Sequence, residues 1–148
     1  WSLSSYSHPS ARATRSLSVM SELSICLRCG GFVAKAIICG SRACCDRASV
    51  WLALDMYRKE LDLTEIAEGG AKGVDRLARK WAQGAGISCR TFEADWEHGG
   101  KAAGPARNAR MLDEFAADYV IAFPGGFGTA DMVRRARVAG IEVVCVDH

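Results

Sequence analysis

Residues 119–136 read YVIAFPGGFGTADMVRRA, and this stretch decides the fold. The four apolar residues 119–122 have the length and composition of a buried strand. A proline and three glycines follow at once, and then Met132, Val133 and Ala136 recur at the spacing of one helical face. The stretch therefore predicts a strand, a tight glycine turn and an amphipathic helix.

The same unit occurs throughout the preceding sequence. VAKAIICGSR (33–42) and TEIAEGG (64–70) are apolar runs that end in glycine, and a helical pattern follows each. ISCRTFEADW (87–96) predicts a third strand, which leads through a polar loop to a helix that begins near Gly104, and IEVVCVD (141–147) predicts the last strand. Strands that alternate with helices at this spacing indicate right-handed crossovers and a parallel sheet covered on both faces. We therefore predict an α/β fold: a Rossmann-like three-layer sandwich with a mostly parallel five-stranded sheet.

Composition limits the domain organisation. The 148 residues are 49% hydrophobic, which suits one globular domain, and no apolar run reaches the roughly 18 residues of a membrane span. Residues 1–32 are rich in serine and hold the whole net charge of +2, so residues 33–148 are neutral. We expect residues 1–32 to form a disordered or non-core extension. The neutral domain argues against nucleic acid as a partner.

Cysteine usage points to a reducing compartment. The chain has seven cysteines, an odd number, and Cys39 and Cys145 lie inside apolar runs where a thiol behaves as a small hydrophobe. We therefore expect a cytoplasmic protein without a disulfide framework. The CLRC motif at 26–29 and the CC pair at 44–45 could supply four thiolates for zinc, but adjacent cysteines constrain tetrahedral geometry. No metal and no cofactor are predicted.

Glycines follow three of the predicted strands, at Gly40, at 69–73 and at 125–128. Ligands of such sheets bind beyond the carboxyl ends of the strands, where helix amino termini favour anions. The three turns together predict a phosphate site, although each turn alone could serve only as a tight connection. GGAKGVDR lacks the Gly-Lys-Ser/Thr ending of a P-loop, and Asp131 stands where a dinucleotide fingerprint has its third glycine. An ordinary kinase or dehydrogenase is therefore disfavoured.

Three longer segments carry a resemblance to a known family. EGGAKGVDRLARKWA (68–82), ADW (94–96) with GKAAGPARNARMLD (100–113), and FPGGFGTADMVRRARVAGI (123–141) are similar to the SLOG superfamily of Rossmann-like nucleotide-binding domains. The similarity is to its YspA/cpYpsA-related branch of small bacterial and phage proteins, and it covers about residues 34–147. It implies a nucleotide or nucleotide-derived ligand and a homodimer. More distant relatives are the LOG-type phosphoribohydrolases and the DprA proteins.

The resemblance leaves catalysis open. In the LOG pattern an arginine and a glutamate act on the ribose and on the bond to the base. Arg107 and Asn108 are similar to the first part of this pattern, although asparagine replaces a lysine, and Met132 stands at the glutamate position. Asp131 lies one residue earlier, about 100° around the helix, so it does not simply replace that carboxylate. We therefore name Arg107 and Asp131 as candidate catalytic residues of a function that this departure disfavours.

Three functions follow in order of preference. The first is a domain that binds a nucleotide or nucleotide derivative, as a sensor or in nucleotide processing. The second is a phosphoribohydrolase that cleaves the N-glycosidic bond of nucleoside 5′-monophosphates, and the third is a DprA-like module for single-stranded DNA. The predicted nucleotide-binding residues lie at strand ends and helix starts: Gly40, Ser41, Arg42, Gly69, Gly70, Gly73, Asp75, Asp95, Arg107, Asn108, Gly125, Gly126, Gly128 and Thr129.

Several of these residues have a purely structural alternative. Arg107 suits bidentate phosphate recognition better than it suits a plain surface position. Asp75 and Asp131 are predicted in the first turn of a helix, where a carboxylate is stabilising without any ligand. Thr129 could cap its helix or contact phosphate, and Asp95 could accept a ribose hydroxyl or cap a loop. Four other residues are assigned no ligand. We expect His98 to be a loop residue, and we expect a solvated helix face to be formed by Arg134, Arg135 and Arg137.

Overall fold

The structure, a computed structural model, describes residues 33–147, which belong to the second of two units into which the chain divides, residues 1–32 and 33–148. The predicted extension and the cysteines at 26–29 lie outside the described residues. The described elements are β1 (Ala34–Cys39), α1 (Arg47–Leu61), β2 (Leu63–Glu68), α2 (Val74–Ala85), β3 (Ser88–Thr91), α3 (Trp96–Gly99), a 3₁₀ turn (Gly100–Ala102), α4 (Ala103–Phe115), β4 (Tyr119–Ala122), α5 (Phe127–Val138) and β5 (Glu142–Cys145).

All five strands are parallel, in the order β3-β2-β1-β4-β5. The chain first builds outward from β1 to β3 and then returns to place β4 on the other side of β1, where Ala36 lies opposite Tyr119. The order of the strands therefore reverses between β1 and β4, and in such sheets this reversal opens a crevice at the carboxyl ends. The predicted Rossmann-like α/β fold is confirmed, with a sheet that is parallel throughout.

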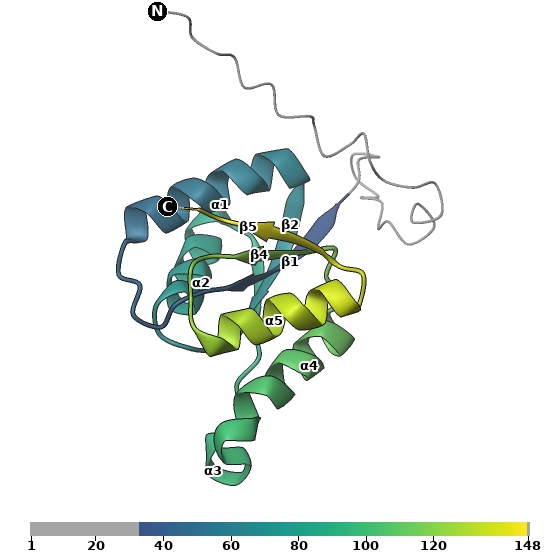
Figure 1. Cartoon of the computed structure of the whole chain (residues 1–148). Helices are drawn as coiled ribbons and strands as arrows, with labels where there is room; N and C mark the ends of the chain where they lie inside the picture. The colour runs from purple at the N-terminus through teal and green to yellow at the C-terminus, as the bar shows by residue number, and fades with distance from the viewer. Residues whose placement is uncertain (1–32, 148) are drawn as a thin grey trace, which may run out of the picture. The chain divides into compact units, whose positions relative to one another are not determined.

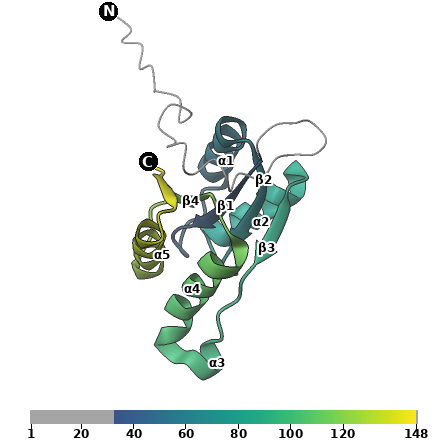
Figure 2. The ribbon, with the colours of Figure 1, turned by 90° about the vertical axis from the view of Figure 1, so that its right-hand side faces the viewer.

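Helices cover the sheet on both faces (Figures 1 and 2). α1 and α2 lie on one face, and α4 and α5 lie on the other. Because successive side chains of a strand point to opposite faces, β1 supplies both layers. Ala36 and Ile38 pack with the core beneath α1 and α2, whereas Ile37 packs with the core beneath α4 and α5. This double burial explains why the central strands are apolar without alternation.

Local sequence determines where α1 begins and ends. The carboxylate of Asp46 accepts a hydrogen bond from the backbone amide of Ser49 at 3.1 Å and so caps the helix. Val50 and Leu54, four residues apart, bury the inner face. Asp62 ends the helix in the left-handed conformation at φ 54°, and β2 begins with the next residue. No helix within residues 33–147 has the length and hydropathy of a bilayer span.

Two local predictions were wrong, and one alternative that the sequence left open is decided. α5 begins at Phe127 with Gly126 as its N-cap, so Thr129 is already inside the helix and does not cap it. Asp131 lies in the second turn of α5, beyond the first turn in which we expected it. His98 belongs to the short helix α3, and its ring nitrogen lies 2.9 Å from the carboxylate of Asp95, so it is not a loop residue without a partner.

Candidate functional site

A cavity of about 850 Å³ opens at the carboxyl ends of the strands, beside the reversal between β1 and β4. Its size lies in the range of small-molecule and cofactor sites. Loops after β1 and β2, the first turn of α5 and the first half of α4 contribute to its wall. Ten of the predicted nucleotide-binding residues line it: Gly40, Ser41, Arg42, Gly69, Asp75, Arg107, Asn108, Gly126, Gly128 and Thr129.

Four predicted nucleotide-binding residues do not line this cavity, and neither does the candidate catalytic residue Asp131. Gly70 and Gly73 lie in the loop after β2, and Gly125 packs against Thr129 and the backbone of Gly40. The carboxylate of Asp95 accepts a hydrogen bond from the amide of His98 at 3.2 Å. Asp95 therefore has a capping role, but it caps the helix α3 and not a loop, and it borders a separate cavity of about 310 Å³.

Two kinds of glycine surround the cavity. A side chain at Gly40 would meet the Cβ atoms of Val74 and Phe123 at 2.9 Å, and Gly73 has φ +74° beside the carbonyl of Ser41, so close packing requires these glycines. Gly126 differs, because a Cβ atom there would meet no described residue within 4 Å, and the same holds for Gly128, two residues further along the chain. At these two positions glycine keeps space open rather than allowing a tight turn.

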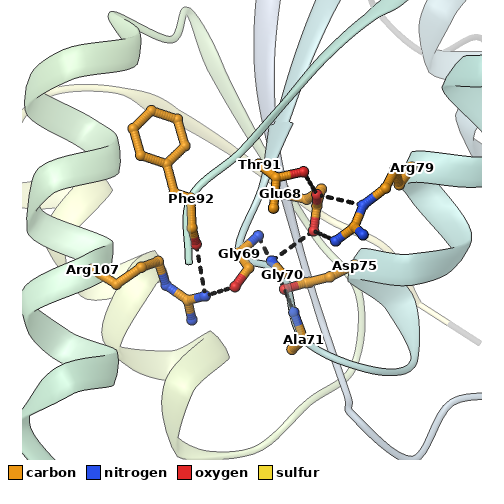
Figure 3. A network of polar contacts seen from close by, with 9 residues as sticks. All are labelled: Glu68, Gly69, Gly70, Ala71, Asp75, Arg79, Thr91, Phe92 and Arg107. Carbon is orange, nitrogen blue, oxygen red and sulfur yellow. Dashed lines mark hydrogen bonds and ion pairs between the residues drawn. The ribbon is translucent and has the colours of Figure 1, made fainter. Parts of the chain in front are cut away.

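The loop after β2 is held by carboxylates of the chain itself (Figure 3). One oxygen of Asp75 accepts hydrogen bonds from the amides of Gly69 at 3.1 Å and Ala71 at 3.3 Å. Glu68 accepts a hydrogen bond from the amide of Gly70 at 2.7 Å. Three successive amides of this glycine loop therefore already have an anionic acceptor within the protein.

Glu68 is the centre of this network, and the sequence analysis missed it. Its side chain is 0% exposed, and it forms an ion pair with Arg79 at 2.9 Å and accepts a hydrogen bond from the hydroxyl of Thr91. Figure 3 shows these groups converging on the carboxylate at the end of β2. A glutamate that closes an apolar strand was the available signal, because an acid at such a position needs a partner when it is buried.

Asp75 lines the cavity, and the pKa of its carboxyl group departs strongly from the ordinary value. Burial raises its pKa to about 6, and the charge of Glu68 adds to this shift. The amides of Ala71 and Gly69 and the guanidinium of Arg107 act in the opposite direction. Asp75 can therefore gain or lose a proton near neutral pH.

Arg107 reaches from α4 across the cavity wall. Its guanidinium donates hydrogen bonds to the carbonyl of Gly69 and, at 3.5 Å, to that of Phe92, and its Nε donates to the side-chain oxygen of Asn108 at 3.0 Å. Burial lowers its pKa, although nearby Asp75 opposes that shift. Arginine stays protonated in proteins, so Arg107 places a half-buried positive charge in the wall.

Asn108 connects α4 to α5. Its amide donates to the carbonyl of Gly128 at 3.1 Å and to the carboxylate of Asp131 at 3.0 Å. Arg134 and Arg135 form ion pairs with the same carboxylate, at 2.8 Å and 2.9 Å. Arg134 is exposed and Arg135 half-buried, so both border solvent, but the predicted solvated face did not include their contacts with Asp131.

The cavity wall is electropositive. Arg42, Lys101 and Arg107 line it, and among the described residues Asp75 is the single carboxyl residue that does so. Cys39 also lines it, but burial and the charge of Asp75 raise the pKa of this thiol to about 12, so it stays protonated and is not a nucleophile. Two aromatic residues that the sequence analysis did not single out complete the wall, Trp96 and Phe127.

Comparison with known proteins agrees with this architecture. The family model of the YspA, cpYpsA-related SLOG family matches residues 34–99. The Gene 61 protein of Mycobacterium phage D29 is 39% identical over 119 residues, which cover 74% of this chain and 94% of the phage protein. The chain belongs to the YspA, cpYpsA-related SLOG family. The resemblance inferred from the sequence motifs is thereby confirmed.

A solved structure supports the fold assignment of this SLOG domain. The X-ray structure of TM1055, a structural genomics target, superposes with a TM-score of 0.60 over 74% of this chain and 72% of its own. The two sequences are 21% identical over the superposed part. The likeness therefore concerns the fold, and the function of the SLOG domain has to be argued from its own cavity.

Proposed function

We propose that this domain binds a nucleotide or nucleotide-derived ligand in the cavity at the carboxyl ends of β1 and β4. The observation that carries the proposal is the start of α5, which has Gly126 as its N-cap and no side-chain cap, and which opens into an electropositive cavity. The first amides of a helix have no partner inside the helix, and the helix dipole favours an anion there. A phosphate group fits this position.

The surroundings of α5 suit a phosphate in size and in charge. Gly126 and Gly128 leave open space beside the backbone, so an anion can approach the amides closely. Arg107, Lys101 and Arg42 supply positive charge from three other segments of the same wall. The neutral net charge of residues 33–148 means that this positive charge is local, which favours a small anionic ligand over a long polyanion.

This proposal changes the role of the loop after β2. The sequence alone led us to expect a phosphate site formed by the glycine turns together, with the turn after β2 among them. The amides of Gly69, Gly70 and Ala71, however, donate to Asp75 and Glu68, and a phosphate would have to displace one of these carboxylates. We therefore assign the phosphate to α5, and we assign the loop after β2 to one wall of the cavity.

A hydrolase is the second candidate function. Cleavage of an N-glycosidic bond builds positive charge on the ribose, which a nearby carboxylate stabilises. Met132 lines the cavity at the position of the LOG glutamate, and Asp131 does not line it. Asp75 is the carboxyl residue in the wall, and its pKa of about 6 would suit acid–base chemistry. Any hydrolysis would therefore depend on Asp75, a role for which the LOG pattern offers no counterpart.

Thermal shift measurements test the binding proposal. Adenosine, guanosine, cytidine and uridine 5′-monophosphates should be added separately to the wild type, and at least one should raise Tm, since a ligand of the folded state stabilises it. Gly126→Val should fold and lose this response, because its side chain would occupy the open space beside the amides. Gly84→Val is the matched control, since Gly84 also has open space around it but lies away from the cavity.

Two results would decide between this proposal and its alternatives. If Gly126→Val folds and still responds fully to every nucleotide that stabilises the wild type, the glycine turn has no binding role. If instead single-stranded DNA binds in a strongly salt-dependent manner, the DprA-like module is the better description. Native mass spectrometry of the purified protein would identify a ligand that stays bound during purification. The homodimer that the resemblance implies stays a prediction, and sedimentation velocity measures it.

A further inference from the structure

The aromatic side chains of the domain are distributed unevenly. Residues 33–147 contain nine of them, and within this part of the chain only two are exposed, Trp96 at 50% and Phe127 at 81%. Both exposed rings line the same cavity. The other seven are buried or half-buried: Trp51, Tyr57, Trp81, Phe92, Phe115, Tyr119 and Phe123. Within residues 33–147, exposed aromatic rings therefore occur only where the proposed ligand would lie.

Phe127 occupies an unusual position in this wall. It is the first residue of α5, and it stands between Gly126 and Gly128, which have no side chains. Among residues 33–147 a Cβ atom at either glycine would meet nothing within 4 Å, so in this part of the chain the backbone on both sides of Phe127 faces open space. Exposure of a phenylalanine ring to water is unfavourable, and at this position the core does not bury the ring. A flat apolar group of a ligand could cover it.

Trp96 differs from Phe127, because part of its ring already has a partner. The guanidinium of Arg42 lies 5.0 Å from the centroid of the ring, within the range of a cation–π contact. The far edge of the same ring approaches Gly104, where a Cβ atom would come within 3.3 Å of it. Trp96 is therefore suited to hold Arg42 at the cavity, and Phe127 is left as the uncovered ring.

We propose that Phe127 is the platform on which the aromatic base of the ligand stacks, while the phosphate of the same molecule lies at the start of α5. This inference rests on the proposed nucleotide-binding function and narrows its ligand class. A sugar phosphate without a base would satisfy the cations but would leave the ring of Phe127 exposed. The ligand is therefore a phosphorylated compound with an aromatic ring system, and purines, which have the larger ring area, bind better than pyrimidines.

The inference is tested by titration calorimetry with two probes that differ by the base. Adenosine 5′-monophosphate and ribose 5-phosphate should each be titrated into the full chain and into Phe127→Ala. Removal of the ring should lower the affinity for adenosine 5′-monophosphate by about 5-fold to 150-fold, the range found for stacked bases. The affinity for ribose 5-phosphate should change less than about twofold, because that probe has no group that stacks. Phe127→Tyr should keep the wild-type affinity for both probes.

A control variant separates stacking from a general effect of apolar exposure. Val138 is 83% exposed, lies at the other end of α5 and does not line the cavity, so Val138→Ala should bind both probes as the wild type does. The inference about Phe127 is overturned if Phe127→Ala keeps the wild-type affinity for the nucleotide, or if the substitution lowers the affinity for both probes equally. It is also overturned if the variant changes only the sedimentation coefficient, since the ring would then contact a second copy of the chain. If the wild type binds neither probe, the proposed function itself fails.

Discussion

Asn108 and Asp131 join α4 to α5 through a buried hydrogen bond of 3.0 Å, in which the side-chain amide donates to the carboxylate. The same carboxylate accepts from Arg134 and Arg135, so several donors surround it. Asp131 had been a candidate for catalysis because of its place in the glycine motif. The contacts around it describe instead a carboxylate that joins α5 to α4 and does not itself line the cavity.

Asp131→Asn should therefore lower the free energy of unfolding and leave nucleotide binding intact. We expect a loss of about 1–3 kcal/mol, the usual value of hydrogen bonds to a charged group. Asp113→Asn removes an exposed carboxylate of α4 and is the control. Chemical denaturation at pH 7 gives both values. An Asp131→Asn variant with wild-type stability and no nucleotide response would show that the carboxylate serves the ligand.

The effect of Asp131→Asn should also depend on pH. Burial alone would raise the pKa of Asp131, but hydrogen bonds from Asn108, Arg135 and Arg134 together lower it. A carboxyl group with a lowered pKa in the folded state stabilises that state above its unfolded pKa of about 4, and it loses this contribution as the pH falls through the folded value. The stability difference between wild type and variant should therefore shrink below about pH 4.

The sequence predicted features whose causes are local. Apolar runs with glycine turns indicated β1 and β4 and placed the cavity at their carboxyl ends. The role of Asp131 was not predictable in this way, because its partner Asn108 is 23 residues earlier in the chain and meets it only through packing of two helices. Whether Thr129 caps its helix was left open for a related reason: the choice of N-cap among several small residues depends on where the loop leaves β4.

Glu68 shows a second limit of the sequence. Its partners Arg79 and Thr91 lie 11 and 23 residues away, on α2 and β3, so no local pattern revealed the network. Phe127 and Trp96 were overlooked because an apolar residue next to a glycine turn has no periodicity that distinguishes a cavity wall from a core. Their exposure is a property of the folded chain.

Removal of Glu68 should be costly, because it is buried together with several donors. Glu68→Ala leaves the amide of Gly70 and the guanidinium of Arg79 without their acceptor. Loss of one partner of a buried ion pair costs about 3–5 kcal/mol, and since Arg79 is partly exposed we expect about 2–4 kcal/mol. Glu65→Ala, on the same strand, removes a partly exposed ion pair with Lys35 and should cost less than about 1 kcal/mol. Equal losses for the two variants would contradict the structural role of Glu68.

Asp75 should make the stability of the domain depend on pH in the opposite direction to Asp131. Burial and the charge of Glu68 raise its pKa from 3.8 to about 6, against the influence of Ala71, Gly69 and Arg107. Its protonation therefore favours the folded state, a contribution that is complete below about pH 4 and is lost as the pH rises through about 6. The shift of about two units corresponds to about 3 kcal/mol as an upper value.

Asp75→Asn should remove this pH dependence, because the amide oxygen can still accept from Gly69 and Ala71 but does not ionise. As the pH rises from 4 to 7, the free energy of unfolding of the variant should increase relative to that of the wild type. Denaturant unfolding at several pH values measures this difference. A constant difference between wild type and Asp75→Asn across this range would mean that Asp75 is ionised at every pH tested.

The last prediction concerns Met132, which stands where the LOG pattern has its catalytic glutamate. The side chain is 1% exposed and packs with Ile37 and Val120, while it also reaches the cavity wall. Met132→Glu would place a carboxyl group in largely apolar surroundings, so we expect a loss of stability of about 2–4 kcal/mol. Met132→Leu conserves volume and should cost less than about 1.5 kcal/mol.

Base release from nucleoside 5′-monophosphates, followed by chromatography, shows what the position does for chemistry. The wild type should release no base, because a thioether does not stabilise the positive charge that develops on the ribose. In Met132→Glu the rate of base release should rise more than the affinity for the nucleotide does, since the new carboxylate acts on the transition state. Adding Asp131→Asn to Met132→Glu should change this rate little. Rapid release by the wild type that Asp75→Asn abolishes would make the protein a hydrolase with a different carboxylate. If Asp131→Asn abolishes such release instead, the structural role of Asp131 is wrong, because a carboxylate that only joins α4 to α5 would not affect turnover in a variant that still folds and binds.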